Sequence, residues 1–385
     1  MAKLGDVCDI LNGFAFKSEQ YVEDGIRIIR IANVQKGYIE DSTPVFYPYD
    51  SKDAQKYRLE EGDMLMSLTG NVGRVAKLSK EFLPAALNQR VACLKIKDGI
   101  SLDKAFLFNL LNSDYFEQKC IAESKGVAQK NMSTEWLKEY EIPMFPMEQQ
   151  KAIASVLDKV TELIALRKEQ LAKLDQLVKS RFIELFGTVA ENPYGFQMAT
   201  LKEVCHKITD GKHGGCEQEA DSGYYYVGAR EIYDDVIHYD TAPQITYADF
   251  AKDYKRCNIE RGDMVIVNTG ATIGKTAIAT SPLTERTLLQ KSVALLKVKT
   301  EIISAEFLRH CYMANPSMYK VESASAQPNL LLSKMNATRI YLPPIELQQQ
   351  FAAFVEQTDK SKLAIQQSLD KLELLKKSLM QEYFG

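Results

Sequence analysis

Two long stretches of the chain carry apolar residues at helical spacing and are not interrupted by Gly or Pro. Within residues 148–186, Leu157, Ile164 and Leu171 follow one another at intervals of seven. This spacing predicts a single helix of 39 residues, which would be about 58 Å long at about 1.5 Å per residue. Residues 346–384 repeat the pattern and predict a second helix of the same length.

A helix of this length with an apolar stripe needs a partner, because helix propensity alone does not keep it stable in water. We expect the two helices to pack antiparallel about an internal pseudo-twofold axis, as a coiled-coil spacer with a globular domain near each end. The alternative, that each helix packs only on its own domain, stays open. The side chains expected between the helices are Val156, Val160, Leu163, Leu171, Leu174, Leu177, Phe354, Ile365, Leu369, Leu372, Leu375 and Leu379.

The rest of the chain mixes short β-branched runs with turn residues. Residues 26–34 and 91–97 have the composition of strands, and residues 103–121 have a helical pattern. This mixture predicts an α+β fold with several strands. Prolines before each long helix, and Pro193 and Gly195 after the first, mark boundaries. We therefore expect globular domains at 1–147 and 198–345, helices at 148–187 and 346–385, and a linker at 188–197.

The chain is a tandem duplication with a period near 198 residues. LGDVCDILNG at Leu4 has a counterpart in LKEVCHKITDG at Leu201, and EGDMLMSLTG at Glu61 has one in RGDMVIVNTG at Arg261. NQRVACLKIK likewise corresponds to LQKSVALLKVK. Residues 146–187 align without gaps to 344–385, with 13 of 42 positions identical. A period of this length makes each copy a domain-sized unit, unlike the short repeats of solenoids.

Charge and composition narrow the possible classes. The net charge of the 385 residues is −3, and Lys+Arg against Asp+Glu is 19 to 21 in residues 1–145 and 17 to 17 in 198–345. Only a local basic patch could therefore support nucleic-acid binding. The sequence has no apolar run of membrane-spanning length and no signal-peptide pattern. Its seven Cys form no CxxC pair, which is typical of a reducing cytoplasm.

Motifs that could carry chemistry are weak. The segment TGATIGKT at 269–276 resembles a phosphate-binding loop, but three residues separate its glycines where that loop needs four, so we interpret it as a turn between strands. His213 and Cys216 lack a second pair of ligands, so we expect no metal site. Asp63 and Asp263 each follow Gly and precede an apolar run, which is typical of a turn residue. No catalytic group is predicted.

Basic and amide side chains gather in the predicted turns between strands. Arg, Asn and Gln match base edges in the major groove, while Lys suits phosphates. A solvated surface is the alternative for each of these residues. The candidates for DNA binding are Lys17, Arg27, Arg30, Asn33, Asn71, Arg74, Asn88, Gln89, Arg90, Lys125, Gln129, Lys130, Asn131, Lys212, His213, Arg230, Thr272, Lys275, Gln290, Lys291, Gln327 and Asn329.

The order of these elements resembles the specificity subunit of type I restriction–modification systems. The shared elements are the Val-Cys start, the Gly-Asp-Met and Thr-Gly pairs, and Glu-x-Gln opening a long Lys/Leu helix that ends in Phe-Gly, all doubled. The resemblance implies two target-recognition domains, each reading half of a gapped double-stranded DNA sequence. It also implies helices that set the gap and dock two modification subunits.

The same resemblance places all catalysis in partner subunits. The modification subunits would bind S-adenosylmethionine and methylate adenine, and a motor-nuclease subunit using ATP and Mg²⁺ would cut DNA. This chain would bind no cofactor itself. A separation of the two domains near one duplex turn, about 34 Å, would set both on the same face of DNA. A duplicated coiled-coil scaffold that binds proteins, and a nucleotide-dependent enzyme using TGATIGKT, are the competing hypotheses.

Overall fold

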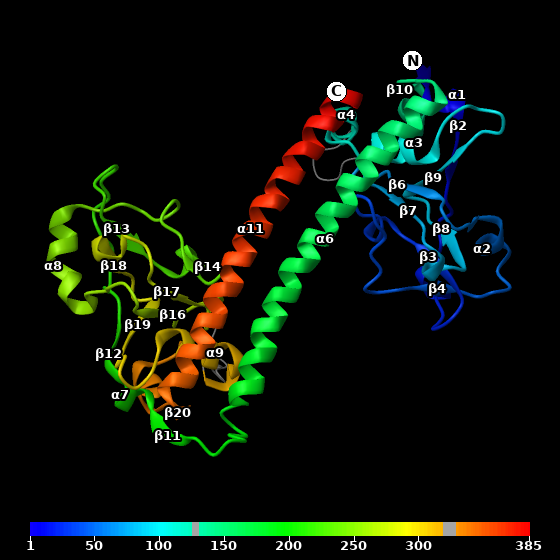
Figure 1. Cartoon of the computed structure of the whole chain (residues 1–385). Coiled ribbons are helices and arrows are strands. Elements are labelled where there is room, and N and C mark those ends of the chain that lie inside the picture. The colour runs from blue at the N-terminus through cyan, green and yellow to red at the C-terminus, as the bar shows by residue number, and fades with distance from the viewer. Residues whose placement is uncertain (125–130, 319–328) are drawn as a thin grey trace. The chain divides into compact units, whose positions relative to one another are not determined.

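The computed structural model describes residues 1–124, 131–318 and 329–385. The chain divides into two units: a first unit of Met1–Lys168 with Gln367–Gly385, and a second unit of Glu169–Gln366. Each long helix contributes residues to both units (Figure 1).

The first unit is a mixed α+β structure. Its helices are α1 (Leu4–Val7), α2 (Lys52–Lys56), α3 (Lys104–Leu111), α4 (Asp114–Glu123) and α5 (Thr134–Glu139). Its strands are β1 (Ala2–Lys3), β2 (Cys8–Asn12), β3 (Ile26–Ile29), β4 (Phe46–Tyr47), β5 (Arg58–Leu59), β6 (Met64–Ser67), β7 (Val75–Lys77), β8 (Ala85–Leu87), β9 (Val91–Ile96) and β10 (Glu141–Ile142). Two four-stranded sheets have the orders β2-β9-β6-β7 and β4-β3-β8-β5, and β1 pairs with β10.

Strand β6 of the β2-β9-β6-β7 sheet is buried on both faces. Met64 and Met66 face the core that contains α3, α4 and the start of α6 (Met147–Phe186), while Leu65 between them faces the second sheet. This alternation follows from the period of two along a strand. It explains why β6 reads as an uninterrupted apolar run.

The second unit repeats this plan. Its helices are α7 (Leu201–Val204), α8 (Tyr247–Cys257), α9 (Ala305–Ala314) and α10 (Leu332–Ala337). Its strands are β11 (Gln197–Thr200), β12 (Cys205–Asp210), β13 (Tyr225–Val227), β14 (Ile232–Tyr233), β15 (Val236–Ile237), β16 (Met264–Val267), β17 (Thr276–Ile278), β18 (Thr287–Leu289), β19 (Val293–Val298) and β20 (Arg339–Leu342). The sheet order β12-β19-β16-β17 matches that of the first unit, and β13 pairs parallel with β18 as β3 does with β8.

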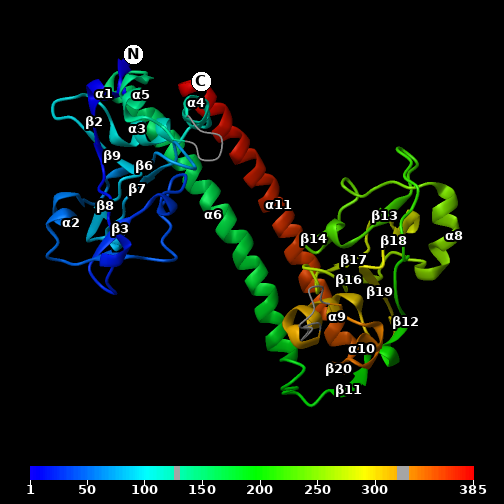
Figure 2. The ribbon, with the colours of Figure 1, turned by 180° about the vertical axis from the view of Figure 1, so that it is seen from behind.

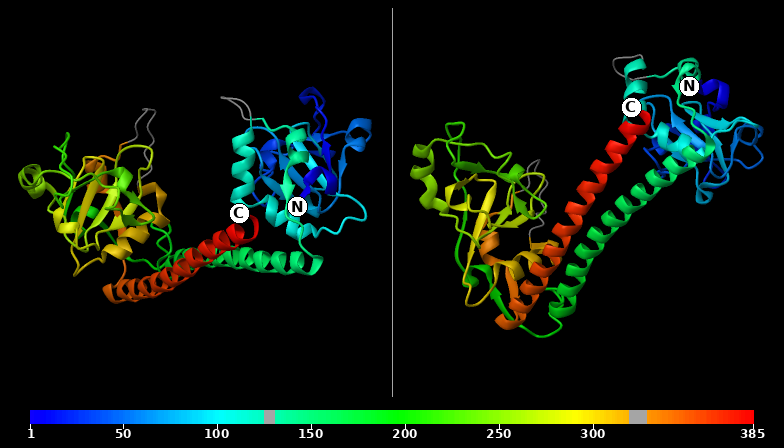
Figure 3. Two further views of the ribbon diagram at one scale, coloured as in Figure 1. Left: turned by 90° about the horizontal axis from the view of Figure 1, so that it is seen from above. Right: turned by 45° about the horizontal axis from the view of Figure 1, so that its top comes forward.

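The core of the second unit joins its sheet to the helices. Met264 and Ile266 of β16 pack in one cluster with Phe307 of α9 and Met335 of α10. Figures 2 and 3 show these two helices beside α11 (Ile345–Phe384) on the same side of the strands. The equivalent order of strands in both units confirms that the duplication in sequence is also a duplication of the fold.

The two predicted long helices are confirmed. They are α6 (Met147–Phe186) and α11 (Ile345–Phe384), each of 40 residues. In the first unit, Leu157 near the start of α6 shares a core with Met380 near the end of α11, and Lys168 Nζ lies 2.9 Å from Glu373. Since the start of one helix meets the end of the other, they are antiparallel there.

The second unit has the same antiparallel arrangement at the other ends of the two helices. Phe182 and Phe186 of α6 pack on Phe351 of α11, and Lys362 Nζ lies 2.7 Å from Asp175. The helices therefore contact each other as well as their own globular parts, in both units.

The predicted packing stripe is wider than the one observed. Val156, Leu163, Leu177 and Leu375 are 41 to 48% exposed, so they do not fill the interface between the helices. The first three stand one position before the sevenfold line of Leu157, and one residue is a rotation of about 100° around a helix. The predicted residues that are buried or half-buried are Val160, Leu171, Leu174, Phe354, Ile365, Leu369, Leu372 and Leu379.

One predicted helix is two. Residues 103–121 divide into α3 and α4, because Asn112 ends the first and Ser113 begins the second. Ser113 Oγ accepts a hydrogen bond from the backbone N–H of Phe116 at 3.1 Å. Such a cap satisfies the start of a new helix and favours a break in the chain direction.

Candidate nucleic-acid interface

Backbone hydrogen bonds draw four separate segments of the first unit into one edge. The N–H of Gln89 donates to Phe14 O at 2.9 Å, that of Leu68 to Arg90 O at 3.0 Å, and that of Met132 to Leu68 O at 2.8 Å. We call residues 14–17, 68–72, 88–90 and 131–132 the first turn edge. It collects the end of β2, the turns after β6 and β8, and the segment before α5.

The second unit builds the same edge with different residues. The N–H of Lys212 donates to Leu289 O at 2.7 Å, that of Asn268 to Ser292 O at 3.0 Å, and that of Leu330 to Asn268 O at 2.7 Å. Residues 212–216, 268–272, 290–292 and 329–330 form this second turn edge. The two edges arise from equivalent strands. Their side chains differ, so the same backbone arrangement presents two different sets of polar groups.

A glycine next to each turn edge lets two backbone segments approach each other closely. A Cβ at Gly13 would overlap the carbonyl oxygens of Leu87 and Asn88, and one at Gly211 those of Leu289 and Gln290. The duplicated Gly after each Val-Cys element is thus required by close backbone approach.

We expect Gly211→Ala to lower the free energy of unfolding by about 1–3 kcal/mol, because the new methyl group must displace backbone. Gly215→Ala is the matched control, since open space surrounds that position, and its effect should stay within about 0.5 kcal/mol. Denaturant unfolding of the two variants checks this. Equal stability of both variants would contradict the role of Gly211.

About half of the sequence candidates are exposed, most of them on the turn edges. In the first unit these are Lys17, Asn71, Gln89, Arg90 and Asn131, and in the second they are His213, Arg230, Lys275, Lys291 and Asn329. Asn88, Thr272 and Gln290 are half-buried on the same edges. Lys125, Gln129, Lys130 and Gln327 lie outside the described residues.

Other candidates make contacts within their own unit. Arg27 pairs with Asp41 and lies over the rings of Phe46 and Phe82. Asn33 is 4% exposed, and its amide donates to Glu40 O at 2.8 Å, so its side chain is engaged within the first unit.

Two further arginines are also engaged. Arg30 donates to Thr43 O at 2.6 Å, and Arg74 donates to Gln35. These bonds stabilise the loops beside β3 and β7. Sequence alone did not reveal them because the partners lie 13 and 39 residues away.

The motifs that were interpreted as turns are turns. TGATIGKT joins β16 to β17, which pair antiparallel, so a strand follows it rather than the helix of a phosphate-binding loop. The carboxylates of Asp63 and Asp263 accept from the N–H of Glu60 and Glu260 at 2.9 and 2.8 Å. Among the described residues, no three His, Cys, Asp or Glu side chains are placed to hold a metal ion, and no helix is long and apolar enough to cross a membrane.

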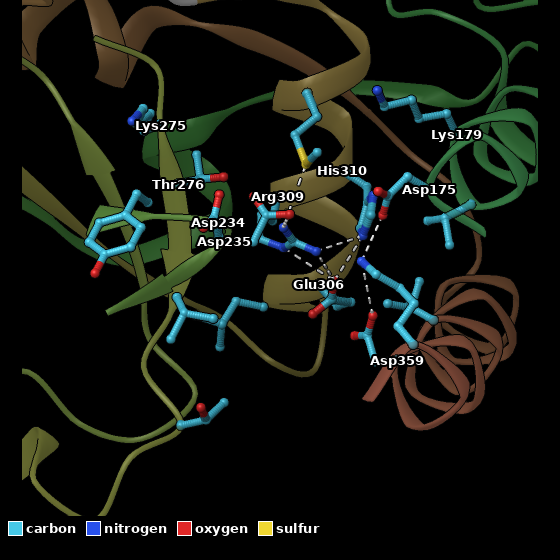
Figure 4. Close-up of a pocket in the computed structure, with 18 of the residues that line it drawn as sticks. Asp175, Lys179, Asp234, Asp235, Lys275, Thr276, Glu306, Arg309, His310 and Asp359 are labelled. Atoms are coloured by element: carbon cyan, nitrogen blue, oxygen red, sulfur yellow. Dashed lines mark hydrogen bonds and ion pairs between the residues drawn. The ribbon is translucent and has the colours of Figure 1, made fainter. Parts of the chain in front are cut away.

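A charged cavity in the second unit was missed by sequence reasoning. It has a volume of about 880 Å³ and lies between the long helices, α9 and the turn of β14–β15 (Figure 4). Arg309, 7% exposed, lies 3.0 Å from Asp235 and 2.9 Å from Glu306. His310 lies 2.9 Å from the same Glu306 oxygen. The charges pair with one another, so they anchor the β14–β15 turn to α9.

The Glu306 carboxylate gives this cluster a pH dependence. Burial raises the pKa of Glu306, but hydrogen bonding to His310 and the charge of Arg309 outweigh it and bring the pKa to about 2, from 4.5. The stability from this ionised group is therefore present above pH 4.5 and is lost as the pH falls through about 2.

We expect Glu306→Gln to lower the unfolding midpoint by about 5 °C at pH 7. The gap to the unmodified chain should narrow as the pH falls from 4.5 toward 2, because Glu306 of the unfolded chain then takes up a proton while the folded carboxylate is still ionised. Glu301→Gln, at an exposed position near the start of α9, is the control. A gap that stays constant from pH 7 to pH 3 would contradict the assignment.

Comparisons with known proteins agree with this duplicated architecture. Residues 1–176 and 193–374 each match the family described as type I restriction modification DNA specificity domain. The chain is 23% identical to the type I restriction enzyme EcoBI specificity subunit of Escherichia coli over 416 residues, 99% of this chain and 84% of that one. It is 32% identical over 186 residues to the MjaVIII specificity subunit of Methanocaldococcus jannaschii, 46% of this chain and 43% of that one.

Solved structures share the fold over the whole length. The crystal structure of a type I restriction–modification S subunit from M. genitalium has a TM-score of 0.60 at 18% identity, covering 100% of this chain and 95% of that one. A chain from a study of assembly and conformational transition of the type I system has a TM-score of 0.61 at 18% identity, covering 100% and 96%. With a family match over both copies and a shared fold, the chain belongs to the type I restriction–modification DNA specificity family.

Proposed function

We propose that each unit reads one half of a gapped double-stranded DNA target through its turn edge. The observation that carries this proposal is the same edge built twice from different residues. Gln89 in the first unit corresponds to Lys291 in the second, because their N–H groups donate to the equivalent carbonyls of Phe14 and Lys212. Asn71 has Thr272 in the equivalent hairpin turn. A Gln suits the donor and acceptor of adenine, and a Lys suits phosphate. Two such edges would read two different half-sites.

The long helices would set the length of the gap and dock two modification subunits. Both helices contribute to both units, which makes them the physical link between the half-sites. They also carry exposed apolar side chains at Leu163, Leu166, Leu363 and Leu374, which are 43 to 69% exposed. Exposed leucines in this number on paired helices favour a protein partner.

Catalysis belongs to the partners in this proposal. The modification subunits would bind S-adenosylmethionine and methylate adenine, and the motor-nuclease subunits would use ATP and Mg²⁺. This chain would hold no cofactor and act in the cytoplasm. The balanced charge of each globular part fits this division, because much of the contact with phosphates would come from the partners.

DNA binding by the assembled complex tests the proposal. The chain with its modification subunits should retain duplex DNA, and the logarithm of the binding constant should fall linearly with the logarithm of salt concentration, at about 0.9 per phosphate neutralised. A complex that assembles but shows no salt-dependent retention of any duplex would favour the protein-binding scaffold instead.

A further inference from the structure

Lys212 of the second turn edge is held by two carboxylates of α8. Its side chain is 12% exposed, and its Nζ lies 2.8 Å from Asp253 and 3.4 Å from Asp249. The hydrogen bond with Asp253 is the largest effect on the pKa of Lys212, which lies well above its usual value. The ammonium is therefore charged, surrounded by one more negative charge than it supplies, and largely removed from solvent.

The same helix holds the other end of the segment that follows. Asp249 accepts a hydrogen bond from the N–H of Glu217 at 2.7 Å, and the N–H of Thr246, the N-cap of α8, donates to Glu217 O at 3.1 Å. Residues 213–216 form an arch between these two anchors. The arch contains the exposed His213 and Gly214, and Gly214 O accepts from the hydroxyl of Tyr226.

The first unit holds its equivalent segment in another way. There Phe14 and Phe16 contact each other edge to face, Phe16 contacts Tyr47, and Tyr47 Oη accepts from the N–H of Lys17 at 3.1 Å. Its helix α2 has 5 residues, whereas α8 has 11. Among the described residues, only the second unit therefore holds this segment with carboxylates of a neighbouring helix.

We propose that Lys212 and Asp249 are positioning residues that set the shape of the arch, and through it the half-site read by the second unit. The inference rests on the proposed function and gives Lys212 a different role from the contact with DNA that the sequence predicts. To reach a phosphate, Lys212 would have to leave two carboxylates, and Asp249 and Asp253 would then be left facing DNA uncompensated. Losing one partner of a buried charge pair is costly.

Two variants distinguish positioning from phosphate binding. The assembled complex with its modification subunits is measured with Lys212→Met and with Asp249→Asn, by salt-dependent DNA binding and by methylation of a library with randomised half-sites. Both variants should lower base discrimination in the second half-site about tenfold, with the first half-site and the salt slope unchanged. Asp249→Asn keeps the shape of the side chain and removes its charge. It therefore tests the same prediction if the Lys212→Met chain does not fold.

The contrary outcomes are distinct. A phosphate-binding Lys212 predicts a salt slope reduced by about one for Lys212→Met. It also predicts tighter binding for Asp249→Asn, because one of the two carboxylates that compete with phosphate for the lysine is removed. Either result overturns the inference. Lys291→Met, at the exposed neighbouring position, calibrates the slope. Failure of the unmodified complex to bind DNA would instead overturn the proposed function.

Discussion

Deletion of residues 167–173 together with 365–371 is expected to shorten the gap in the recognised DNA by about three base pairs. Each deletion removes one heptad, about 10.5 Å of helix, against about 3.4 Å per base pair. The two segments are equivalent in the duplication, and removing whole heptads keeps the packing residues on the same face. The half-site sequences should not change, because both turn edges lie outside the deleted segments.

Binding by this variant should also weaken. Three base pairs turn one half-site by about 100° around the duplex relative to the other. Mapping of methylated sites measures gap and half-sites together. A chain of unchanged length with Lys173→Gln and Lys371→Gln, both at exposed positions, is the control. An unaltered gap, or altered half-sites with an intact gap, would contradict the role of the helices as a spacer.

Replacement of Gln150 or Gln348 by Leu is expected to cost about 2–4 kcal/mol of stability. Gln150 Oε1 accepts from the N–H of Asp103 at 2.8 Å, and its Nε2 donates to Ser101 O and Phe145 O. Both glutamines are fully buried. A Leu in that place leaves three backbone groups without a partner, and the unfolding midpoint should fall by roughly 5–12 °C.

Gln348 makes the same three bonds in the second unit. Its Oε1 accepts from the N–H of Ser304 at 2.9 Å, and its Nε2 donates to Ile302 O and Pro343 O. Gln149→Leu and Gln349→Leu are the matched controls, one residue away and exposed. If calorimetry finds each control as destabilised as its buried neighbour, the stabilising role of the Gln150 and Gln348 hydrogen bonds is ruled out.

The doubled Glu-x-Gln element shows how far sequence reasoning reached. Its repetition at the start of both helices is visible in the sequence. The pattern does not show that Gln150 and Gln348 hydrogen-bond each helix to the backbone before α3 and α9. The partners lie 47 and 44 residues away. The long helices follow from the local periodicity of apolar residues, and the duplication follows from matching segments about 198 residues apart.

The interior of the helix pair was harder to predict. Lys362 of α11 stands at a packing position and is half-buried against Asp175. An apolar stripe does not reveal a lysine whose charge is satisfied across the interface. Conversely, the predicted stripe includes the apolar residues Val156 and Leu163, which are exposed. Periodicity predicts which face packs, whereas the width of the packed face depends on the partner.

The turn edges were partly predictable. Turn residues such as Gln89 and Lys291 were identified because turns between strands reach the surface. Arg27, Asn33 and Lys212 have the same residue types in similar places, but each is engaged by a partner that the fold brings from elsewhere. Residue type marks a candidate, and only the tertiary contacts separate a free surface group from one that stabilises a loop.

The most direct test of two independent half-site readers is the exchange of residues 1–145 for the corresponding segment of another family member. The exchanged chain is assembled with its modification subunits, and methylated adenines are mapped across a sequenced DNA. We predict that one half-site changes to a new sequence while the other half-site and the gap stay as they were. A change in both half-sites, or in neither, would contradict the account.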